Sequence, residues 1–444
     1  MIKLVLKTIF TGDGDKMRKF IKKLEKSGKL IKIKKKVSKR FEAAMVMKQL
    51  EDKPIFFENV DGWKVVGNLF PTRDIICEYF GVKRDQLIKF VNKAIKNPTN
   101  PITVKKAPCQ EIIEESVDLT KLPILLHTPK DGGPYVISGI VIANDPEYRR
   151  NCAFHRLMLF DKNKFAIRLL PRHTYQFLER AGGEMDVAVV IGNGLNVLLA
   201  SAISVDIGVD ELKIANSLKP LKTVRCKTVD IEVPAESEFV LEGRIIKETH
   251  PEGPFLDLTE TYDIVREQPV LEIKKITRRK DPIYHALLPG GLEHKMLMGL
   301  PREPTIFEEV NKVTTCKDVY ITPGGCSWLH AIVQIKKKNE NDGRLAIEAA
   351  FKGHRSLKHV VIVDDDIDIY NPSEVEWAIA TRFQAKDRII IKEEPGSSLD
   401  PSADPKTRMT SKVGIDATKP LVAKGKNFEK VKFQKVNVKK YLDK

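Results

Sequence analysis

The chain has few cysteines and no long apolar run. Its 444 residues include six cysteines, none of them in a C-x-x-C pair, namely Cys77, Cys109, Cys152, Cys226, Cys316 and Cys326. This spacing supports neither a disulfide framework nor a zinc site, so we expect free thiols in a reducing compartment. No apolar stretch approaches the roughly 20 residues that cross a bilayer, and the N-terminal stretch lacks the pattern of a signal peptide. We therefore predict a cytoplasmic protein without membrane contact.

Aromatic residues are also sparse, at 7% of the chain. No RNA- or DNA-binding motif accompanies the net charge of +16, and the lysines are scattered, with the densest groups near the two ends. Nucleic-acid binding is therefore a disfavoured alternative from another functional class. The basic excess fits a lysine-rich surface mixed with glutamate, or an enzyme whose ligands are anionic.

The pattern of apolar residues changes twice along the chain, which predicts an α+β protein of three domains. Residues 1–100 form an N-terminal α/β domain, whose first helix we expect to be capped by Asp15 and ended by Gly28. Residues 101–303 are dominated by strands with helical insertions, which is typical of a β-barrel. Residues 304–444 alternate helix and strand in an α/β domain with an extended tail.

Four polar residues interrupt an apolar meander of predicted strands between residues 135 and 173. Asn151, Arg156, Arg172 and His173 stand on or beside strands that are otherwise apolar. Burying such groups on a sheet is unfavourable unless something binds them. They form either a ligand site or, in the simpler interpretation, a sheet rim whose members hydrogen-bond to one another.

Two groups of residues offer different chemistry. Asn151, His173 and Glu211 supply an amide oxygen, an imidazole and a carboxylate, a mixed set that suits Mn²⁺ or Mg²⁺ better than zinc. In the second group, Arg156 between Glu252 and Asp257 would keep one carboxylate ionised and let the other carry a proton. Sequence alone does not show that the two groups meet in space.

Two other motifs resemble a metal site and a nucleotide-binding loop, and each has a simpler explanation. Asp364, Asp365 and Asp366 end a predicted strand, where acidic residues often bind metal. We favour a structural role for them, as a helix cap or as partners of basic residues. The segment IGNGLN at residues 191–196 lacks the third glycine of a dinucleotide-binding fingerprint, so we interpret it as a turn into a short helix.

Six motifs, in this order and spacing, resemble the UbiD-type decarboxylases that use prenylated FMN. They are NDPEYRRNCAFHR, LLPRH, HPEGPFLD, GGCSW, VIVDDDIDI and SKVGIDATKP. The resemblance covers nearly the whole chain. It implies that the central domain is an FMN-binding split β-barrel and that the protein is a carboxy-lyase.

The resemblance also assigns roles to individual residues. It places the metal, Mn²⁺ or Mg²⁺ with K⁺ as an additional candidate ion, on Asn151, His173 and Glu211. It places catalysis on Arg156, Glu252 and Asp257, where Asp stands in place of the commoner Glu. A side chain shorter by one methylene must sit on a closer backbone or act through water. The implied cofactor contacts are Asn151, Cys152, Ala153, Phe154, His155, Arg156, Arg172, His173, Ser201, Glu211 and Lys412.

Substrate and partners follow from the same resemblance. The compact chain and its LTETYD loop are most similar to an archaeal subgroup that converts trans-anhydromevalonate 5-phosphate to isopentenyl phosphate and CO₂. His294, Lys295 and Arg302 are then candidate phosphate partners, unless their segment is only a solvated loop. An aromatic acid, such as a prenylated 4-hydroxybenzoate, is the alternative substrate. The expected partners are a flavin prenyltransferase, as cofactor supplier, and further copies of the chain in a homodimer or larger oligomer.

Overall fold

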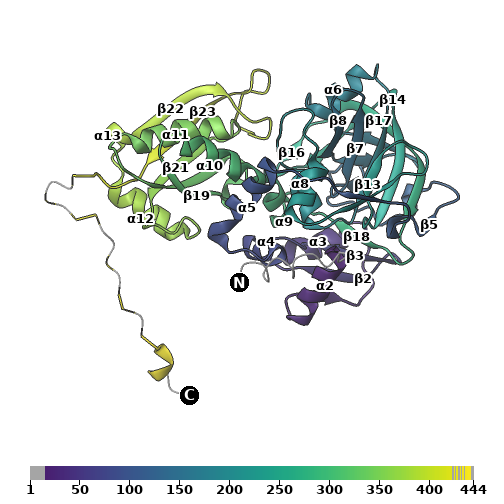
Figure 1. Cartoon of the computed structure of the whole chain (residues 1–444), viewed down its shortest axis with the longest axis horizontal. Coiled ribbons are helices and arrows are strands. Elements are labelled where there is room, and N and C mark those ends of the chain that lie inside the picture. Colours follow the sequence, from purple (N-terminus) through teal and green to yellow (C-terminus); the bar gives the residue numbers. More distant parts are fainter. Residues whose placement is uncertain are drawn as a thin grey trace.

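The computed structural model describes residues 16–422, 425, 427–428, 431, 433–434 and 436–441. Figure 1 shows a C-terminal part beside a larger central part, with the N-terminal elements packed below and between them. The fold is a mixed α/β fold. Asp15, the expected cap of the first helix, lies outside the described residues.

The N-terminal part is built as its apolar pattern predicts. Helix α2 buries Met17, Phe20 and Leu24, and the chain leaves it at Gly28, whose φ of 71° suits glycine. Thr72 caps the next long helix by accepting a hydrogen bond from the Ile75 amide. The elements are α2 (Lys16–Lys26), β1 (Ile31–Ile33), α3 (Glu42–Gln49), β2 (Ile55–Val60), β3 (Trp63–Gly67), α4 (Arg73–Phe80) and α5 (Arg84–Lys96).

One strand of this N-terminal sheet comes from the predicted central domain. The sheet has the order β1-β2-β3-β18, and β18 (Ile283–Ala286) runs parallel to β3. Residues far apart in the chain therefore complete one sheet. The division of the chain at residues 100 and 303 stays a prediction.

The central part is a nine-stranded sheet that is not closed. Its order is β6-β9-β10-β17-β14-β11-β7-β8, with β5 pairing β17 as well. No pairing among the described residues joins β6 to β8, so the expected barrel is not a closed one, and its split form stays a prediction. The strands are β5 (Ile112–Ile113), β6 (Tyr135–Val136), β7 (Ile140–Asp145), β8 (Arg149–Phe154), β9 (Leu157–Leu159), β10 (Lys164–Ile167), β11 (Met185–Ile191), β14 (Phe239–Glu252) and β17 (Arg266–Arg278).

The central sheet is buried on both faces. Val187, Val189 and Ile191 of β11 enter one hydrophobic core, whereas Ala188 and Val190 enter the other. The expected helical insertions are present, and the IGNGLN segment is a turn into a short helix as predicted. These helices are α6 (His173–Arg180), α7 (Leu195–Ala200) and α8 (Glu211–Leu218).

Short elements border the central sheet and connect it to the next part. The hairpin of β15 (Phe255–Leu256) and β16 (Tyr262–Asp263) lies between the end of β14 and the start of β17. A small sheet joins β4 (Ile102–Val104), β12 (Lys222–Arg225) and β13 (Glu232–Pro234). The remaining elements are η1 (Pro108–Gln110), η2 (Leu119–Lys121), α9 (Leu292–Gly299) and η3 (Leu300–Arg302).

The C-terminal part is a five-stranded mixed sheet with helices, as its alternating pattern predicts. Its strand order is β19-β20-β21-β23-β22, and the pairs β20–β21 and β21–β23 are parallel. Its elements are α10 (Glu303–Asn311), β19 (Thr315–Ile321), η4 (Pro323–Gly325), β20 (His330–Lys336), α11 (Asp342–Gly353), β21 (His359–Asp364), α12 (Pro372–Arg382), α13 (Ala385–Arg388), β22 (Ile389–Pro395), β23 (Met409–Asp416) and η5 (Val438–Lys440).

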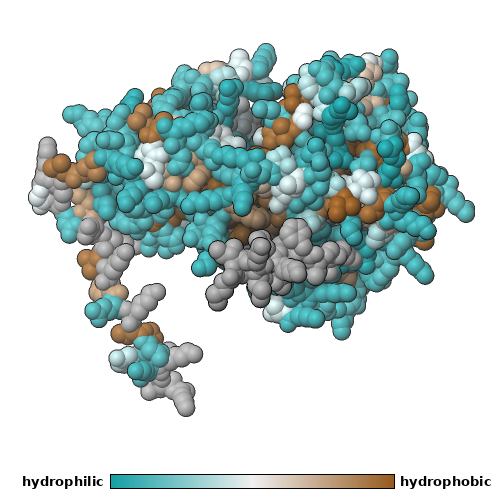
Figure 2. Space-filling model, viewed as in Figure 1, coloured by the Kyte–Doolittle hydropathy of each residue, from teal (hydrophilic) through white to brown (hydrophobic). Residues whose placement is uncertain are grey.

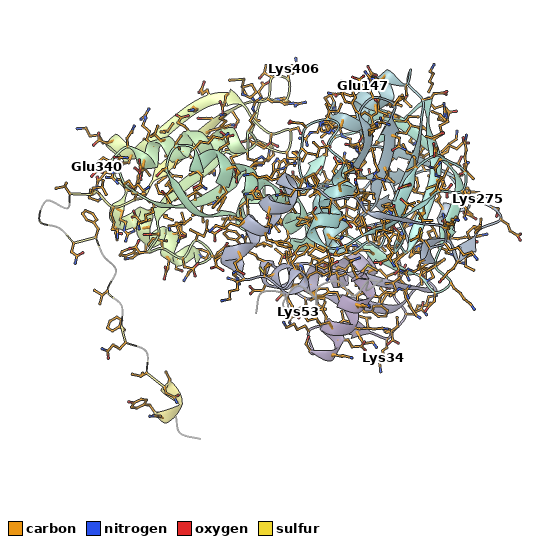
Figure 3. The ribbon with its side chains drawn as sticks, viewed as in Figure 1. Lys34, Lys53, Glu147, Lys275, Glu340 and Lys406 are labelled. Carbon is orange, nitrogen blue, oxygen red and sulfur yellow. The ribbon has the colours of Figure 1, made fainter. Side chains whose placement is uncertain are left out.

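The surface and the thiols agree with the composition. The face shown in Figure 2 is mostly hydrophilic, and the lysines labelled in Figure 3 are distributed over all three parts of the chain. All six cysteines are free, and five of them are buried. Among the described helices, none combines the length and the apolar character that a membrane span requires.

Candidate active site

Arg156 joins the two carboxylates that the sequence analysis grouped with it. It lies between β8 and β9, and its Nε and Nη2 atoms donate to the two oxygens of Glu252, each at 2.9 Å. Its Nη1 atom donates to Asp257 Oδ2 at 2.7 Å. Glu252 ends β14 and Asp257 follows β15, so the tip of the central sheet brings the three side chains together.

The short side chain of Asp257 reaches Arg156 without a bridging group. The backbone is held close because the Asp257 amide donates to the Thr261 carbonyl and the Glu260 amide donates to the Asp257 carbonyl, at 3.0 and 2.9 Å. Asp257 Oδ1 also accepts from the Leu258 amide at 2.6 Å. The turn therefore holds Asp257 in direct contact with Arg156.

A third carboxylate, which the sequence analysis missed, completes the network. Asp263 Oδ2 accepts from Arg156 Nη2 at 2.8 Å, and its Oδ1 accepts from Arg266 Nη1 at 2.7 Å. The feature that places Asp263 in the network is the β15–β16 hairpin. It pairs Phe255 with Asp263 and so brings this aspartate back towards Arg156. A hairpin prediction over residues 255–263 would have found it.

The network is largely shielded from water. Glu252 is fully buried and also accepts from the Tyr135 hydroxyl at 3.0 Å, while the ring of Phe255 lies 4.4 Å from the Arg156 guanidinium. Burial opposes the charge on Arg156, but the bonds to Glu252 and the charges of Asp257 and Asp263 outweigh it and raise its pKa. The guanidinium is therefore permanently charged.

The predicted metal ligands lie around one strand and two helix starts. His173 is the first residue of α6, Glu211 is the first residue of α8, and Asn151 lies on β8. Glu211 Oε2 accepts from the Cys152 amide at 2.8 Å, and Asn151 Nδ2 donates to Thr174 Oγ1 at 2.9 Å. Hydrogen bonds thus tie the regions of all three to β8, although none of those between described residues joins the three side chains directly.

The chemistry of this set fits a divalent cation. Burial raises the pKa of Glu211 to about 8, and no basic side chain among the described residues lies within ion-pair distance of it. Burial and the charge of Arg172 lower the pKa of His173, which leaves its imidazole neutral, as a ligand must be. The Asn151 amide nitrogen is engaged, and no hydrogen bond from a described residue occupies its oxygen. A bound cation would stabilise the buried carboxylate.

The other predicted cofactor contacts are spread over three elements. Cys152, Ala153 and Phe154 continue along β8, and the buried Cys152 thiol has a raised pKa, so it is not a nucleophile. Ser201 follows α7, and its Oγ atom is buried without a partner among the described residues. Lys412 on β23 is buried and donates to the Arg355 carbonyl at 2.6 Å.

His155, another predicted cofactor contact, is linked to the predicted metal ligand Asn151 through the Thr174 hydroxyl. Its Nδ1 atom lies 3.0 Å from the Arg168 carbonyl and its Nε2 atom lies 2.9 Å from Thr174 Oγ1. Burial lowers the pKa of His155 to about 4, so the ring is neutral. The Thr174 hydroxyl then donates to His155 and accepts from Asn151, which fixes the orientation of the Asn151 amide.

Basic groups gather where the central and C-terminal parts meet. Burial and the charges of Arg302, Lys412 and Arg172 lower the pKa of His354 to about 3. Arg302 is buried against the ring of Trp328, and its Nε atom has no hydrogen-bond partner among the described residues. Burial and nearby Arg172 lower the pKa of Arg302 to about 10. Lys412 also pairs with Glu394 Oε1 at 2.8 Å, and His354 is neutral. In this basic cluster, Arg172, Arg302, His354 and Lys412, the character of an anion site therefore rests on Arg172 and Arg302.

The segment from Leu287 to Arg302 is not a solvated loop. Most of α9 is buried, including Lys295, whose Nζ atom pairs with Glu260. His294 Nδ1 accepts from the Gly290 amide at 3.1 Å, and burial lowers the pKa of His294 to about 4, so the proton of this neutral ring is on Nε2. Of the three predicted phosphate partners, Lys295 is therefore engaged, whereas no described residue occupies Arg302 Nε or the Nε2 atom of His294 by a hydrogen bond.

The acidic run after β21 has the structural role that we favoured. Arg382 donates to Asp364 and Asp366 at 2.9 and 2.8 Å, and Lys419 donates to Asp366 at 3.2 Å. Asp364 and Asp366 are thus paired with basic side chains. No group of three His, Cys, Asp or Glu side chains among the described residues is arranged to hold a metal ion.

Comparison with known proteins identifies the family of this chain. Three domain models of 3-octaprenyl-4-hydroxybenzoate carboxy-lyase, the N-terminal, Rift-related and C-terminal domains of UbiD, match residues 21–95, 101–292 and 295–417. The anhydromevalonate phosphate decarboxylase of Methanosarcina mazei is 46% identical over 93% of this chain and 98% of its own. The chain belongs to the UbiD family.

Solved UbiD structures share the whole fold. The UbiD-class enzyme HmfF from Pelotomaculum thermopropionicum, in complex with FMN, matches with a TM-score of 0.92 and 39% identity, covering 96% of this chain and 100% of its own. An evolved dimeric form of HmfF with prenylated FMN matches with a TM-score of 0.89 and 37% identity, covering 96% and 99%. Structural neighbours of this UbiD protein therefore bind FMN or its prenylated form, and the protein is a UbiD-family carboxy-lyase.

Proposed function

We propose that this UbiD-family protein decarboxylates a phosphorylated α,β-unsaturated acid, trans-anhydromevalonate 5-phosphate, to isopentenyl phosphate and CO₂. The geometry that carries the proposal is the combination of two regions: an arginine surrounded by carboxylates, and a separate basic cluster without a carboxylate on Arg302. The first suits an acid that loses CO₂ and gains a proton. The second suits an anionic group at the other end of the same molecule.

The α9 helix links these two regions. The charges of Asp257 and Arg156 act on His294 at its start, and η3 at its end carries Arg302. An α-helical rise of ~1.5 Å per residue puts these two residues roughly 12 Å apart along the helix axis. In our proposal, His294 Nε2 and Arg302 face one elongated substrate, with its phosphate at Arg302 and Arg172.

Asn151, His173 and Glu211 would hold Mn²⁺ or Mg²⁺, with K⁺ as a further candidate ion. Prenylated FMN, when bound, supplies the electron sink for loss of CO₂. We assign its binding to the β8 residues Cys152, Ala153, Phe154, His155 and Arg156, together with Arg172, Ser201 and Lys412. The unpartnered Ser201 hydroxyl and the buried Glu211 carboxyl support this assignment.

Arg156 would orient the substrate carboxylate. A guanidinium has five N–H donors, and four hydrogen bonds to carboxylates use four of them, which leaves one N–H on Nη1 beside Asp257. A substrate carboxylate at that N–H lies next to Asp257, and the two negative groups repel each other unless Asp257 carries a proton. Once CO₂ has left, Asp257 delivers that proton to the former α-carbon.

The test is a substrate comparison with cofactor-loaded protein. The chain is co-expressed with a flavin prenyltransferase, and CO₂ release is measured with trans-anhydromevalonate 5-phosphate, its unphosphorylated form and a set of aromatic acids. We expect turnover of the phosphorylated acid and at least about a hundredfold lower kcat/KM without the phosphate, because charged hydrogen bonds to Arg302 are lost. Equal rates for the two aliphatic acids would refute the phosphate site.

An aromatic acid decarboxylase is the second candidate function. It is favoured by the matching domain models, which carry the name of a carboxy-lyase for a prenylated 4-hydroxybenzoate. Such a substrate offers no second anion for Arg302. A nucleic-acid-binding protein, the alternative suggested by the charge of +16, requires tight, salt-sensitive binding of mixed oligonucleotides.

The proposal includes further expectations about location, partners, assembly and domain structure. The protein works in the cytoplasm, obtains its cofactor from a flavin prenyltransferase and assembles as a homodimer or larger homo-oligomer. Its central part is a split β-barrel between an N-terminal domain ending near residue 100 and a C-terminal domain starting near residue 304. Size-exclusion chromatography with light scattering measures the assembly directly.

A further inference from the structure

A short turn of the N-terminal part contacts both ends of the segment that carries the candidate phosphate partners. The turn, residues 68–73, connects β3 to α4, and the segment consists of α9 and η3, which contains His294 and ends at Arg302. Glu293 lies at the start of this segment, and Glu303 directly follows its end. Both carboxylates are buried, and both accept hydrogen bonds from the turn.

The start of the segment is held by two backbone amides of the turn. Glu293 Oε2 accepts from the Leu69 amide at 2.9 Å, and its Oε1 atom accepts from the Phe70 amide at 3.1 Å. His285 Nε2, on β18, lies 3.0 Å from the same Oε1 atom. A buried carboxylate with several donors is fixed in place, because moving it would leave buried polar groups without partners.

The end of the segment is held by a buried ion pair. Arg73 Nη1 donates to Glu303 Oε2 at 2.5 Å, and Glu303 Oε1 accepts from the Ile321 amide at 3.2 Å. Asp318 is more distant from Arg73, at 4.0 Å from Nη2, and the ring of Tyr370 lies 5.1 Å from the guanidinium. Among the described residues, only Glu303 accepts a hydrogen bond from the Arg73 guanidinium.

The turn itself is held firmly. Asn68 has a left-handed backbone with a φ of 50°, and its side-chain amide donates to the carbonyls of Met47 and Leu50 at 2.8 and 3.0 Å. Asparagine is one of the few residues other than glycine that adopt this conformation readily. Thr72 caps α4 directly before Arg73. The donors that face the two carboxylates therefore come from one well-fixed element.

We propose that Arg73 is a positioning residue for the anion site, because it holds Glu303 and thereby fixes the neighbouring Arg302. Arg302 and Glu303 both have helical backbones, so their side chains point about 100° apart around the helix axis. The guanidinium of Arg302 lies over the ring of Trp328, while the carboxylate is turned to the N-terminal part. The inference rests on the proposed function, because it concerns the phosphate that Arg302 binds there.

The two attachments set the spacing between the ends of the proposed substrate site. Arg302 is also held by the Thr305 hydroxyl, which donates to its carbonyl at 2.8 Å, and by the ring of Trp328. Both of these neighbours belong to the C-terminal part, so they fix Arg302 relative to that part. The two carboxylates instead tie His294 and Arg302 to a single turn. The N-terminal part thus determines how well a phosphorylated substrate fits.

The first experiment is a double-mutant cycle in cofactor-loaded protein, with trans-anhydromevalonate 5-phosphate and its unphosphorylated form. Arg73→Met should raise KM for the phosphorylated acid about tenfold, and should change kcat and the KM of the unphosphorylated acid less than about twofold. In an Arg302→Leu background, Arg73→Met should have no further effect, because its influence passes through Arg302. Effects that multiply in the double variant would overturn the proposal.

A second measurement needs neither cofactor nor substrate. The affinity of the apo-protein for inorganic phosphate, measured by titration calorimetry, should fall about tenfold in Arg302→Leu and in Arg73→Met, and no further when the two are combined. If this holds but the wild type does not turn over anhydromevalonate phosphate, only the proposed function is wrong. If Arg73→Met binds phosphate as the wild type does, the role of Arg73 is wrong, whatever the substrate.

Arg84→Met is the matched control. The Arg84 guanidinium lies over the same Tyr370 ring as that of Arg73, at 5.3 Å, but it pairs with Asp74. Its substitution should leave KM and phosphate affinity unchanged, and an equal loss in this variant would contradict the role of Arg73. Arg73→Lys keeps the charge and should recover most of the wild-type KM. If Arg73→Met does not fold, Glu303→Gln, which removes the same ion pair, takes its place with the same expected results.

Discussion

Two buried arginines, 146 residues apart, are stabilised in opposite ways. Arg156 donates to three carboxylates and its pKa is raised, whereas Arg302 has no carboxylate partner among the described residues and burial lowers its pKa to about 10. The first charge is compensated within the protein, and the second is left for a ligand. The buried Glu211, with its pKa raised to about 8, is the acidic counterpart of Arg302.

The difference shows how burial can indicate function. Where the fold compensates a buried charge, as in the Arg156 network, the charged group is held in place. In our proposal it orients the substrate and helps to supply a proton. A buried charge that the fold leaves alone destabilises the free protein, and it is retained where something else binds it. On this basis we proposed Arg302 for an anion site and Glu211 for a cation site.

The largest effect should come from the compensated region. Asp257→Asn keeps the shape of the network but removes its proton, so kcat should fall by about three orders of magnitude while flavin content stays normal. The measurement is single-turnover CO₂ release together with the flavin absorbance of the purified protein. Activity within a few-fold of the wild type would remove Asp257 from the role of proton donor.

The next effect should come from the uncompensated region. Arg302→Leu should lower kcat/KM for the phosphorylated acid by about a hundredfold, because a charged hydrogen bond and its Coulomb attraction are lost. The loss should appear mainly in KM and should be small for the unphosphorylated acid. Arg302→Lys, which keeps the charge but not the planar fork, should be intermediate. An equal loss with both substrates would instead place Arg302 at the cofactor.

Stability separates the two arginines more directly than activity does. Arg156→Met leaves three carboxylates without their partner and should destabilise the apo-protein by about 3 kcal/mol. Arg302→Met removes a buried, unpaired cation and should leave stability unchanged or raise it by about 1 kcal/mol. Urea unfolding of the apo-proteins at one pH gives both values. The comparison would fail if the two variants lost the same stability.

The smallest expected effect concerns Glu211. Because its pKa is raised in the folded protein, the destabilising ionisation is absent below about pH 4.5 and complete above about pH 8. Apo Glu211→Gln should therefore melt about 2–4 °C above the wild type at pH 8.5 and close to it at pH 4.5. Added Mn²⁺ should raise the melting temperature of the wild type only. A pH-independent difference would contradict the assignment.

Local patterns predicted much of the fold. Helix α2 follows from the spacing of Met17, Phe20 and Leu24 before Gly28, and the turn at residues 191–196 follows from its glycines. These features depend on neighbours within a few residues, where periodicity and capping operate. Local patterns did not show whether the expected barrel closes, because pairing between end strands depends on tilt and twist that no local pattern records.

In the candidate site too, residues recognisable from local motifs differ from those whose role depends on long-range contacts. The residue types at Arg156, Glu252 and Asp257 could be recognised from motifs, and so could Asn151, His173 and Glu211. Asp263 could not, because its role depends on a hairpin that folds it back onto Arg156. In the same way, nothing in the local sequence separates Lys295, which is paired with Glu260, from Arg302, which has no carboxylate partner in the described part of the chain.

By itself, then, the sequence determined which elements form, which family the chain resembles and which side chains are chemically able to act. The tertiary structure alone decided that three carboxylates share Arg156, that β18 completes the N-terminal sheet, and that no described carboxylate pairs with Arg302. The physical reason is range. Helix and turn preferences act over a few residues, whereas charge compensation acts through space, between residues that only the folded chain brings together.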